Sequence, residues 1–406
     1  MADVEAALAA NDPRAALTLL ETLRPEDAEA RSQALFLEGL AALGIEDYDR
    51  AIAALEALVT REPSQARPRL ELARAYFLKG DDANAKRQFE LVRGGDLPPA
   101  TIANIDFFLS EIEARRRWSF RGGLAIAPDT NVNGATSAAT VGLPVLGGTA
   151  TIADEDQAQT GLGLEVNLGA TVLTRPDDSA GRWRATADLF TQTYGEDRFN
   201  AELVTLTAAR LIAGPSHLLA AGVESVTQYA DGEIELQDLT LTGDWTRQVS
   251  PRLELTGGAR AGGRHFAQTD TALRIAGASA GVTYALTSAS RVGAALDIDE
   301  AQGEARSSAR TQVSLQALYY AETSAGVTFA LRPRASFARY HAPDTLFSVE
   351  RRVDRTLALP VQISHRTLRL RGFQPYLQVT LEQRRSVASI FEYDRQRAVL
   401  GLSRQF

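Results

Sequence analysis

The feature of this chain that most restricts its fold is an alternation of apolar and polar residues, which begins at Trp118 and continues to the C-terminus. In the segment RWRATADLF, Trp183 and Leu189 fall on one face while Asp188 falls on the other. A period of two residues is typical of β-strands that have one apolar and one polar face. The pattern occurs in fourteen segments, which begin near residues 118, 157, 182, 199, 216, 233, 251, 271, 290, 307, 324, 351, 370 and 391.

The hydropathy of the chain distinguishes between the two ways of crossing a membrane. Mean hydropathy is only -0.15, and no run approaches the roughly 18 apolar residues that a membrane-spanning helix needs. Strands of a membrane barrel have modest hydropathy, because lipid-facing and lumen-facing residues alternate along them. The sequence therefore excludes membrane-spanning helices and favours a transmembrane β-barrel.

The links between the predicted strands alternate in length. Short, turn-rich links such as 213–217 and 249–252 follow even-numbered strands, whereas longer links such as 128–156 follow odd-numbered ones. Bacterial outer-membrane barrels combine an even strand number with short periplasmic turns and longer outer loops. We expect loop 128–156 to be extracellular and mobile, because it has too little apolar surface to order itself. A soluble all-β domain is the alternative, but it explains fourteen long alternating strands poorly.

Residues 1–117 have a different pattern, with Ala and Leu at helical spacing and a repeat of period 34. The segment resembles the tetratricopeptide repeat at Gly39, Ala51, Leu55 and Pro63, and again at Leu72, Ala73, Tyr76, Ala85 and Phe89. The resemblance implies a concave groove that binds a client. Its lining would be Gln33, Phe36, Leu40, Arg67, Leu70, Arg74 and Phe77. Alternatively, Phe36, Leu40 and Leu70 belong to an ordinary core.

A change of composition near residue 117 marks the domain boundary. Lys79 and Lys86 are the only lysines and precede it, whereas all three Trp residues follow it. We therefore predict an α-solenoid at 1–117 and a 14-stranded antiparallel transmembrane β-barrel at 118–406. The even-numbered residues of the later strands should line the lumen. They include Arg332, Arg334, Gln378, Glu382 and Arg384.

Closure of such a barrel by sequence order pairs the strand at 118–127 with the strand at 391–406. The first of these carries Gly122 and Gly123, and glycine weakens strand pairing. The last ends at Phe406, a terminal aromatic that resembles the signal read by the outer-membrane assembly machinery. We predict that this seam is the weakest pairing in the barrel and a candidate lateral gate. The alternative is that the two glycines relieve crowding or allow a bend.

Charge and chemistry exclude several classes of function. The net charge of -8 argues against nucleic acid as a partner. There is no Cys, and the four His residues do not form a catalytic or metal-binding motif. We therefore expect no catalytic activity, no metal and no cofactor. The opening MADVEAAL has no features of a signal peptide, so we expect that any signal peptide has been removed.

The combination of a short tetratricopeptide domain and a barrel resembles the surface lipoprotein assembly modulator (Slam) family. The segment SFRGGLAIAPDTNVN is similar to the barrel entry of that family. The matching positions are Gly122, Gly123, Leu124, Ile126, Asp129, Asn131 and Asn133. The resemblance implies a monomeric translocon in the bacterial outer membrane that delivers a surface lipoprotein or related secreted protein, with its helical domain in the periplasm. A polysaccharide exporter and a passive porin with a periplasmic docking domain are the alternatives.

Overall fold

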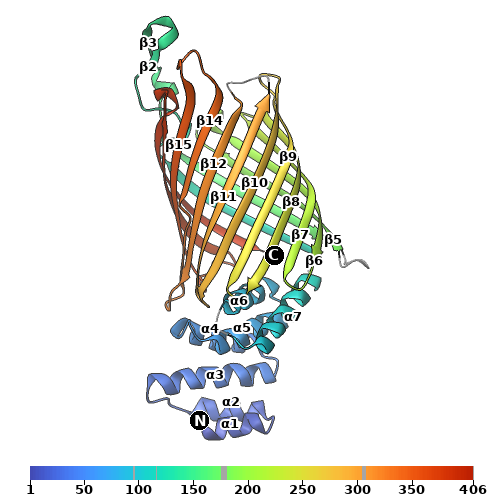
Figure 1. Cartoon of the computed structure of the whole chain (residues 1–406). Helices are drawn as coiled ribbons and strands as arrows, with labels where there is room; N and C mark the ends of the chain where they lie inside the picture. Colours follow the sequence, from blue (N-terminus) through green and yellow to red (C-terminus); the bar gives the residue numbers. More distant parts are fainter. Residues whose placement is uncertain (95–96, 116, 175–180, 304–307, 406) are drawn as a thin grey trace.

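The computed structural model describes the whole chain except residues 95–96, 116, 175–180, 304–307 and 406, and except the side chains of residues 99, 110 and 113–115. It has a helical domain followed by a β-barrel, as the sequence predicts (Figure 1). The helices of the described residues are α1 (Ala2–Ala9), α2 (Pro13–Thr22), α3 (Ala28–Gly44), α4 (Tyr48–Arg61), α5 (Ala66–Lys79), α6 (Asp82–Arg93) and α7 (Pro99–Arg115). None of these helices is both long and apolar enough to cross a bilayer.

The helical repeats are built as their 34-residue period predicts. Asp47 and Asp81 cap α4 and α6, each accepting a hydrogen bond from a backbone amide in the first turn. Between α3 and α4, a Cβ atom at Gly39 would lie 2.5 Å from Cγ of Leu55. The two helices therefore approach closely only because Gly39 has no side chain. The core of the repeats includes Leu55, Leu72 and Phe89, all of which are fully buried or nearly so.

The barrel consists of antiparallel strands that follow one another around its wall. They are β1 (Trp118–Asp129), β4 (Gly161–Leu173), β5 (Gly181–Thr193), β6 (Ala201–Ala213), β7 (His217–Ala230), β8 (Glu233–Ser250), β9 (Leu253–Phe266), β10 (Thr271–Thr287), β11 (Ser290–Gly303), β12 (Arg310–Glu322), β13 (Val327–Leu331), β14 (Arg334–Pro343), β15 (Arg351–His365), β16 (Gln374–Ser386) and β17 (Tyr393–Gln405). Both β13 and β14 pair with β12 and β15, so they form one spanning strand that is interrupted at Arg332 and Pro333. Counted in this way, the described residues form the fourteen barrel strands that the sequence predicts.

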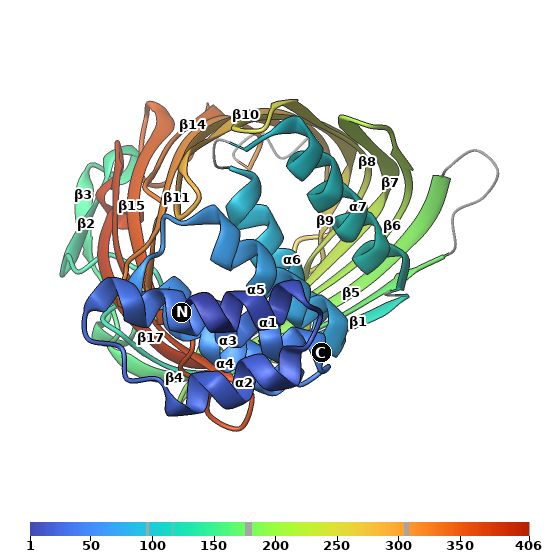
Figure 2. The same ribbon diagram turned by 90° about the horizontal axis from the view of Figure 1, so that it is seen from below.

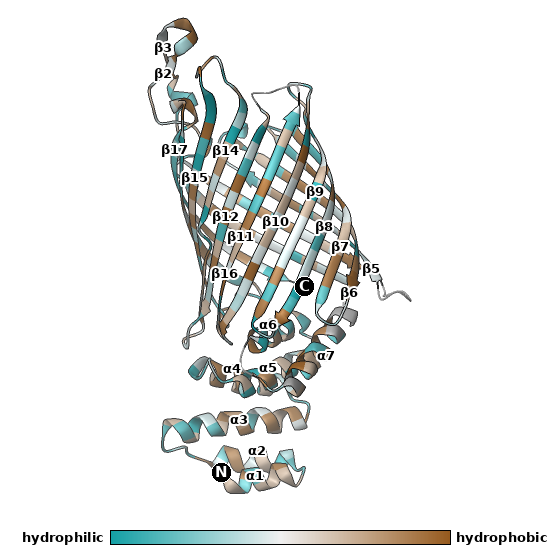
Figure 3. Ribbon diagram, in the orientation of Figure 1, coloured by the Kyte–Doolittle hydropathy of each residue, from teal (hydrophilic) through white to brown (hydrophobic). Residues whose placement is uncertain are grey.

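The barrel closes by pairing β1 with β17, as the order of the strands predicts. Closure leaves no sheet edge, which is the condition for β-structure in lipid. The outward face of the wall is apolar. Large exposed side chains on it include Leu168, Leu241, Leu315, Leu357 and Leu381. An exposed apolar band of this extent is typical of a surface in contact with a bilayer (Figure 3).

Loop 128–156, which the sequence predicts to be extracellular and mobile, contains a hairpin of β2 (Thr140–Leu143) and β3 (Gly148–Thr151). Its mobility and its side of the membrane stay predictions. The hairpin projects from the end of the barrel that is remote from the helices, here called the far end (Figure 1). Polar side chains provide the order that apolar burial does not. Asn131 bonds the backbone of Ala135 in both directions, at 3.0 and 2.8 Å.

The helical domain lies against the opposite end of the barrel, here called the near end. Seen from below, α5, α6 and α7 lie across the mouth of the barrel, whereas Figure 1 shows that α1 and α2 are farthest from it (Figure 2). The near end carries the short connections between strands, including those from β10 to β11 and from β12 to β13. These turns form the contact between the two domains.

Candidate functional site

A buried carboxylate joins the helical domain to the barrel. Glu322, at the near end of β12, lies 3.5 Å from the guanidinium of Arg69 in α5, and both side chains are fully buried. Arg366, which follows β15, donates to the same carboxylate. Arg87 of α6 lies 3.7 Å from it. We call Arg69, Arg87, Glu322 and Arg366 the Glu322 cluster.

The Glu322 cluster is held by neutral groups of the helical domain as well. Arg69 donates to Oε1 of Gln88 and to the carbonyl of Pro63, both at 2.9 Å. Arg366 donates to the hydroxyl of Thr60. Burial and the nearby charge of Arg366 lower the pKa of Arg69, although Glu322 partly offsets this effect. Desolvation of these charges is costly, so each member depends on the others for compensation.

Two further contacts position the helices on the near end. The hydroxyl of Ser288, in the turn between β10 and β11, donates to the carbonyl of Ser64 at 3.4 Å. Arg369, between β15 and β16, donates to Oδ1 of Asn84 at 2.8 Å. Together with Glu322 and Arg366, these residues come from three separate turns of the barrel. The helical domain is therefore fixed in orientation and not only tethered through α7.

Sequence reasoning missed the Glu322 cluster. It singled out Arg67 and Arg74 on the same helix, but the buried residue is Arg69. The signal was present in the spacing, because Arg69 falls between two apolar positions, Pro68 and Leu70, one turn before the core residue Leu72. An arginine at a core position requires a buried acceptor. The sequence does not show that this acceptor is Glu322, since the two are far apart along the chain.

The residues of the predicted client groove lie on α3 and α5. The guanidinium of Arg67 stacks on the ring of Phe36 at 5.1 Å, which brings the two helices together. Gln33 is exposed and donates to Glu5 at 2.8 Å. Arg74 is exposed and lies 3.7 Å from Glu71. Phe36 and Leu70 are partly buried against the core, and Leu40 is also partly buried.

Phe77 does not line an open groove. Its side chain is buried in the core of the helical domain. The ring of Phe108 from α7 meets it edge-on at 5.0 Å. Helix α7 therefore covers this end of the predicted groove, and the prediction for Phe77 is wrong. The remaining surface includes Gln33, Arg67 and Arg74.

The lumen contains a polar cavity of about 490 Å³. Its lining combines acidic, basic and hydroxyl side chains from many strands, among them Asp244, Asp297 and Gln312. Of the five predicted lumen residues, Arg334 lines this cavity. Along the wall, Arg260 of β9 reaches over Gly277 of β10 to pair with Asp299 of β11, with Nε to Oδ1 at 3.1 Å. The wall is therefore polar and charged in both signs, so it suits a hydrated polypeptide or solute rather than an apolar one.

The other predicted lumen residues are distributed along two strands. Glu382 accepts a hydrogen bond from the hydroxyl of Tyr393, and the guanidinium of Arg384 lies 4.7 Å from the centre of the same ring. Gln378 donates to Thr380 at 3.4 Å on the same face of β16. Arg332 lies in the interruption between β13 and β14. The structure thus brings Glu382 and Arg384 together around Tyr393 and leaves Arg332 and Gln378 apart from them.

The seam between β1 and β17 has its two glycines in the near half. Gly122 pairs with Arg404 and Gly123 with Ser403, while Phe406 lies outside the described residues. A Cβ atom at Gly123 would lie 2.6 Å from the side chain of Asn167, so this glycine relieves crowding in the lumen. A Cβ atom at Gly122 would be 3.7 Å from its nearest neighbour, the side chain of Leu168. Whether the seam opens stays a prediction.

The far half of the seam is held by a buried ion pair. Asp129 of β1 is fully buried and accepts two hydrogen bonds from Nε of Arg395 in β17, at 2.9 and 3.0 Å. Arg397 lies 3.6 Å from the same carboxylate and pairs with Glu165 of β4. Asn131 extends the contact, because it donates to the carbonyl of Asp394 at 3.3 Å. The D-x-N sequence after β1 therefore ties the far-end loop and the seam together.

A second cavity lies at the near end between α6 and the ends of β1 and β17. Its volume is about 700 Å³, and its lining is polar. Four arginines from separate elements contribute to it, namely Arg87, Arg121, Arg369 and Arg404. This cavity adjoins the Glu322 cluster, since Arg87 belongs to both. This cavity, called the basic entrance cavity below, lies beside the helical domain.

Comparisons with known proteins agree with this architecture. Residues 225–406 match the family described as surface lipoprotein assembly modifier, and residues 42–95 match the tetratricopeptide repeat. Surface lipoprotein assembly modifier 1 of Haemophilus influenzae is 33% identical over 72 residues, which cover 18% of this chain and 15% of that protein. The protein of the same name from Neisseria meningitidis is 25% identical over 100 residues, covering 25% of this chain and 20% of that one.

Among solved structures, CdiB from Acinetobacter baumannii is similar, with a TM-score of 0.41 and 8% identity. That match covers 72% of this chain and 60% of CdiB. The matched segments of the two modifiers cover only 15% and 20% of their lengths, so they do not define the activity of this chain. The two family matches and the closed barrel nevertheless agree with each other. Residues 225–406 of the β-barrel are thus similar to the surface lipoprotein assembly modifier family, and residues 42–95 of the helical domain are similar to the tetratricopeptide repeat.

Proposed function

We propose that this protein is an outer-membrane translocon that delivers a surface lipoprotein, or a related secreted protein, from the periplasm to the cell surface. In this proposal the near end of the barrel and the helical domain are periplasmic. The near end carries the short turns, which outer-membrane barrels place in the periplasm. The client would meet the surface around Gln33, Arg67 and Arg74 first, and the basic entrance cavity next.

The single observation that carries this proposal is the Glu322 cluster. A domain that only recruited a client could be attached by a flexible linker. Here the helices are fixed to three barrel turns through Glu322, Ser288 and Arg369. Fixing the domain at the mouth places a bound client next to the lumen, which shortens the transfer and orients the chain that enters. The polar lumen suits an extended polypeptide, because its side chains and backbone need hydrogen-bonding partners.

We further propose that the protein acts as a monomeric transport protein without catalytic activity. The barrel closes within one chain, so it needs no second copy to satisfy its strand edges. Insertion would depend on the outer-membrane assembly machinery, as for other barrels.

Surface display in a heterologous host tests the proposal. The full chain is expressed in Escherichia coli together with epitope-tagged lipoproteins from the source genome, one at a time. Antibody binding to intact cells is compared with binding after permeabilisation. We expect at least one lipoprotein to be exposed only when the chain is present. If every lipoprotein stays inaccessible while the barrel is correctly inserted, the translocon proposal is wrong.

A further inference from the structure

The interruption between β13 and β14 weakens the barrel wall on both sides of one short segment. Ala317 of β12 donates to the carbonyl of Pro333 at 2.9 Å, but Pro333 has no N–H to donate in return. On the other side, Arg332 donates to the carbonyl of Pro360 in β15 at 3.1 Å, and Pro360 also has no N–H. Proline is rare in interior strands for this reason. Two reciprocal ladder bonds are therefore missing around Arg332 and Pro333.

An apolar groove lies on the lipid-facing surface at this interruption. Its volume is about 640 Å³, within the range of about 300–1,000 Å³ that is usual for small-ligand sites. Leucine side chains border the groove, and smaller side chains between them leave its space open. These residues are Leu315, Ala317, Pro333, Ala335, Leu357, Leu359 and Leu381. The leucines are exposed, with Leu315 at 55% and Leu357 at 58%.

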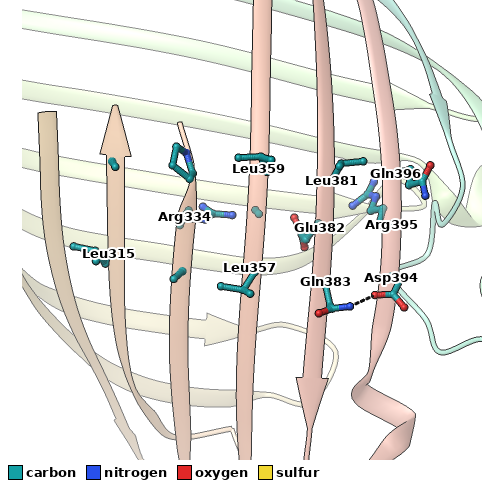
Figure 4. Close-up of a pocket in the computed structure, with 14 residues that line it drawn as sticks. Leu315, Arg334, Leu357, Leu359, Leu381, Glu382, Gln383, Asp394, Arg395 and Gln396 are labelled. Carbon is teal, nitrogen blue, oxygen red and sulfur yellow. Dashed lines mark hydrogen bonds between the residues drawn. The ribbon is translucent and has the colours of Figure 1, made fainter. Parts of the chain in front are cut away.

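The groove becomes polar toward the far end. Gln383, Asp394 and Gln396 line it there, and Gln383 donates to Asp394 at 2.9 Å (Figure 4). Arg385 also pairs with Asp394, with both oxygens at 2.9 to 3.0 Å. A site with an apolar trough and a hydrogen-bonding margin fits one kind of occupant, an amphiphile whose chain lies in the membrane and whose head is at the surface. The far-end position of the margin places that head in the outer leaflet.

The groove also adjoins the lumen. The polar lumen cavity and the lipid-facing groove have one lining residue in common, Arg334. This residue follows Pro333 directly, so it begins β14 at the point where the ladder is incomplete. The polar lumen cavity and the apolar groove therefore meet at one residue, Arg334.

We propose that this groove binds an acyl chain of the client's lipid anchor, which passes beside Arg334 while the polypeptide occupies the lumen. The inference rests on the proposed translocon function. A polar lumen does not accommodate an acyl chain, because burial of apolar surface is favourable only in an apolar environment. The anchor therefore needs a second path, and the groove at the strand interruption provides one. Arg334 would hold the polar group that joins the anchor to the polypeptide.

Chemical bridging across the interruption tests the proposal. The natural chain has no cysteine, so Leu315→Cys with Ala335→Cys bridges β12 to β14, and Ala335→Cys with Leu357→Cys bridges β14 to β15. Ile298→Cys with Val313→Cys bridges β11 to β12 and is the matched control. Each pair is closed with a short, membrane-permeant bifunctional maleimide. Display is measured for one client in a lipidated form and in a form whose lipidated cysteine is replaced by serine.

We expect bridging at the interruption to reduce display of the lipidated client at least 10-fold and to leave secretion of the unlipidated form within 2-fold, which is less than about 0.5 kcal/mol in barrier. The control bridge should affect neither form. Equal display of both forms after bridging overturns the groove proposal while leaving the translocon intact. Equal loss of both forms also overturns it, because the bridge would then obstruct the polypeptide path. Failure of the unbridged chain to move either form overturns the proposed function itself.

A second measurement identifies the occupant directly. A benzophenone amino acid replaces Ala335 in the groove, and the control replaces Leu241 on β8, which is lipid-facing on another part of the wall. The client carries radioactive palmitate. We expect label transfer at position 335 at least five times that at position 241. Equal transfer of the label at the two positions, or none at either, would show that the groove is an ordinary part of the lipid-facing surface.

Discussion

Arg69 of α5 and Glu322 of β12 lie 3.5 Å apart with both side chains fully buried, although one belongs to a helical repeat and the other to a membrane barrel. Arg366 and Arg87 share the same carboxylate. The carboxylate of Glu322 and the guanidinium groups of Arg69 and Arg366 are buried together, so each of these charges depends on the others for compensation. The geometry therefore makes the position of the helical domain depend on one residue of the barrel.

Replacing that carboxylate should release the helical domain. Glu322→Gln leaves Arg69 and Arg366 buried without their counter-charge, a change that costs about 3–5 kcal/mol for a buried ion pair. We expect the undocked population to rise about 100-fold or more. A disulfide between Ser64→Cys and Ser288→Cys reports docking, because these residues are in contact in the structure. The disulfide should form readily in the parent and slowly with Glu322→Gln.

The control for this prediction is an exposed ion pair in the same domain. Asp49→Asn removes the partner of Lys79, and both side chains are largely accessible to solvent. Exposed pairs contribute about 0–1 kcal/mol, so the disulfide should form as in the parent. An unchanged rate with Glu322→Gln would mean that the cluster does not position the helices.

The far-end loop should lose its order when its asparagine is removed. Asn131→Ala deletes the hydrogen bonds to Ala135 and to the carbonyl of Asp394. Leaving buried backbone groups unpaired costs about 1–3 kcal/mol, which is enough to open a loop but not the barrel. Protease added to intact cells should cleave the segment around β2 and β3 faster than in the parent. The exposed substitution Thr149→Ala in the same hairpin should leave cleavage unchanged, and equal cleavage of all three proteins would refute the role of Asn131.

Adjacent positions on β16 should differ in access to water. Leu377 is exposed on the outward face, whereas Gln378 faces the other side and bonds Thr380. A membrane-impermeant maleimide should label Gln378→Cys and spare Leu377→Cys in proteoliposomes, because only the lumen is hydrated. The reverse labelling would mean that Leu377 faces the lumen and Gln378 faces lipid. The predicted lumen positions of Glu382 and Arg384, on the same face as Gln378, would then be wrong.

A crosslink across the seam between β1 and β17 should not reduce lipoprotein display. Leu124 and Leu402 are paired across it, so Leu124→Cys with Leu402→Cys should crosslink in the folded protein. With Asp129 and Arg395 joined at its far half, we expect this bridge to leave lipoprotein display within 2-fold of the parent. Complete loss of display would support the lateral gate predicted at this seam and would weaken the case for the β13–β14 interruption.

The sequence predicts most of this fold because each element has its own period. Residues with a spacing of 34 specify the helical packing around Gly39 and Leu55, and alternation specifies the barrel strands. The alternation predicts one continuous strand through Arg332 and Pro333, which gives the correct number of strands but omits the local break. Alternation alone cannot show it, because the inward and outward residues keep their parity across Pro333.

The candidate sites were harder to predict from the sequence than the fold. Lumen residues follow from parity, so Arg334 and Glu382 could be proposed from the strand pattern. The Glu322 cluster could not, because its members meet only after the two domains dock. Phe77 was misplaced for a related reason, since nothing in its own repeat shows that Phe108 of α7 covers it. The periodic pattern of apolar and polar residues therefore does not predict contacts between elements that are distant in sequence.

The most direct test of the account is transport by the purified protein. The full chain is reconstituted in proteoliposomes, a tagged lipoprotein that is displayed in cells is presented on the side of the helical domain, and protection of the tag from added protease is followed over time. Conductance for small solutes is recorded in the same vesicles. The account predicts that the tag crosses with the parent protein and that Glu322→Gln slows crossing at least 10-fold. Solute conductance without any crossing of the tag would contradict it and identify the barrel as a passive pore.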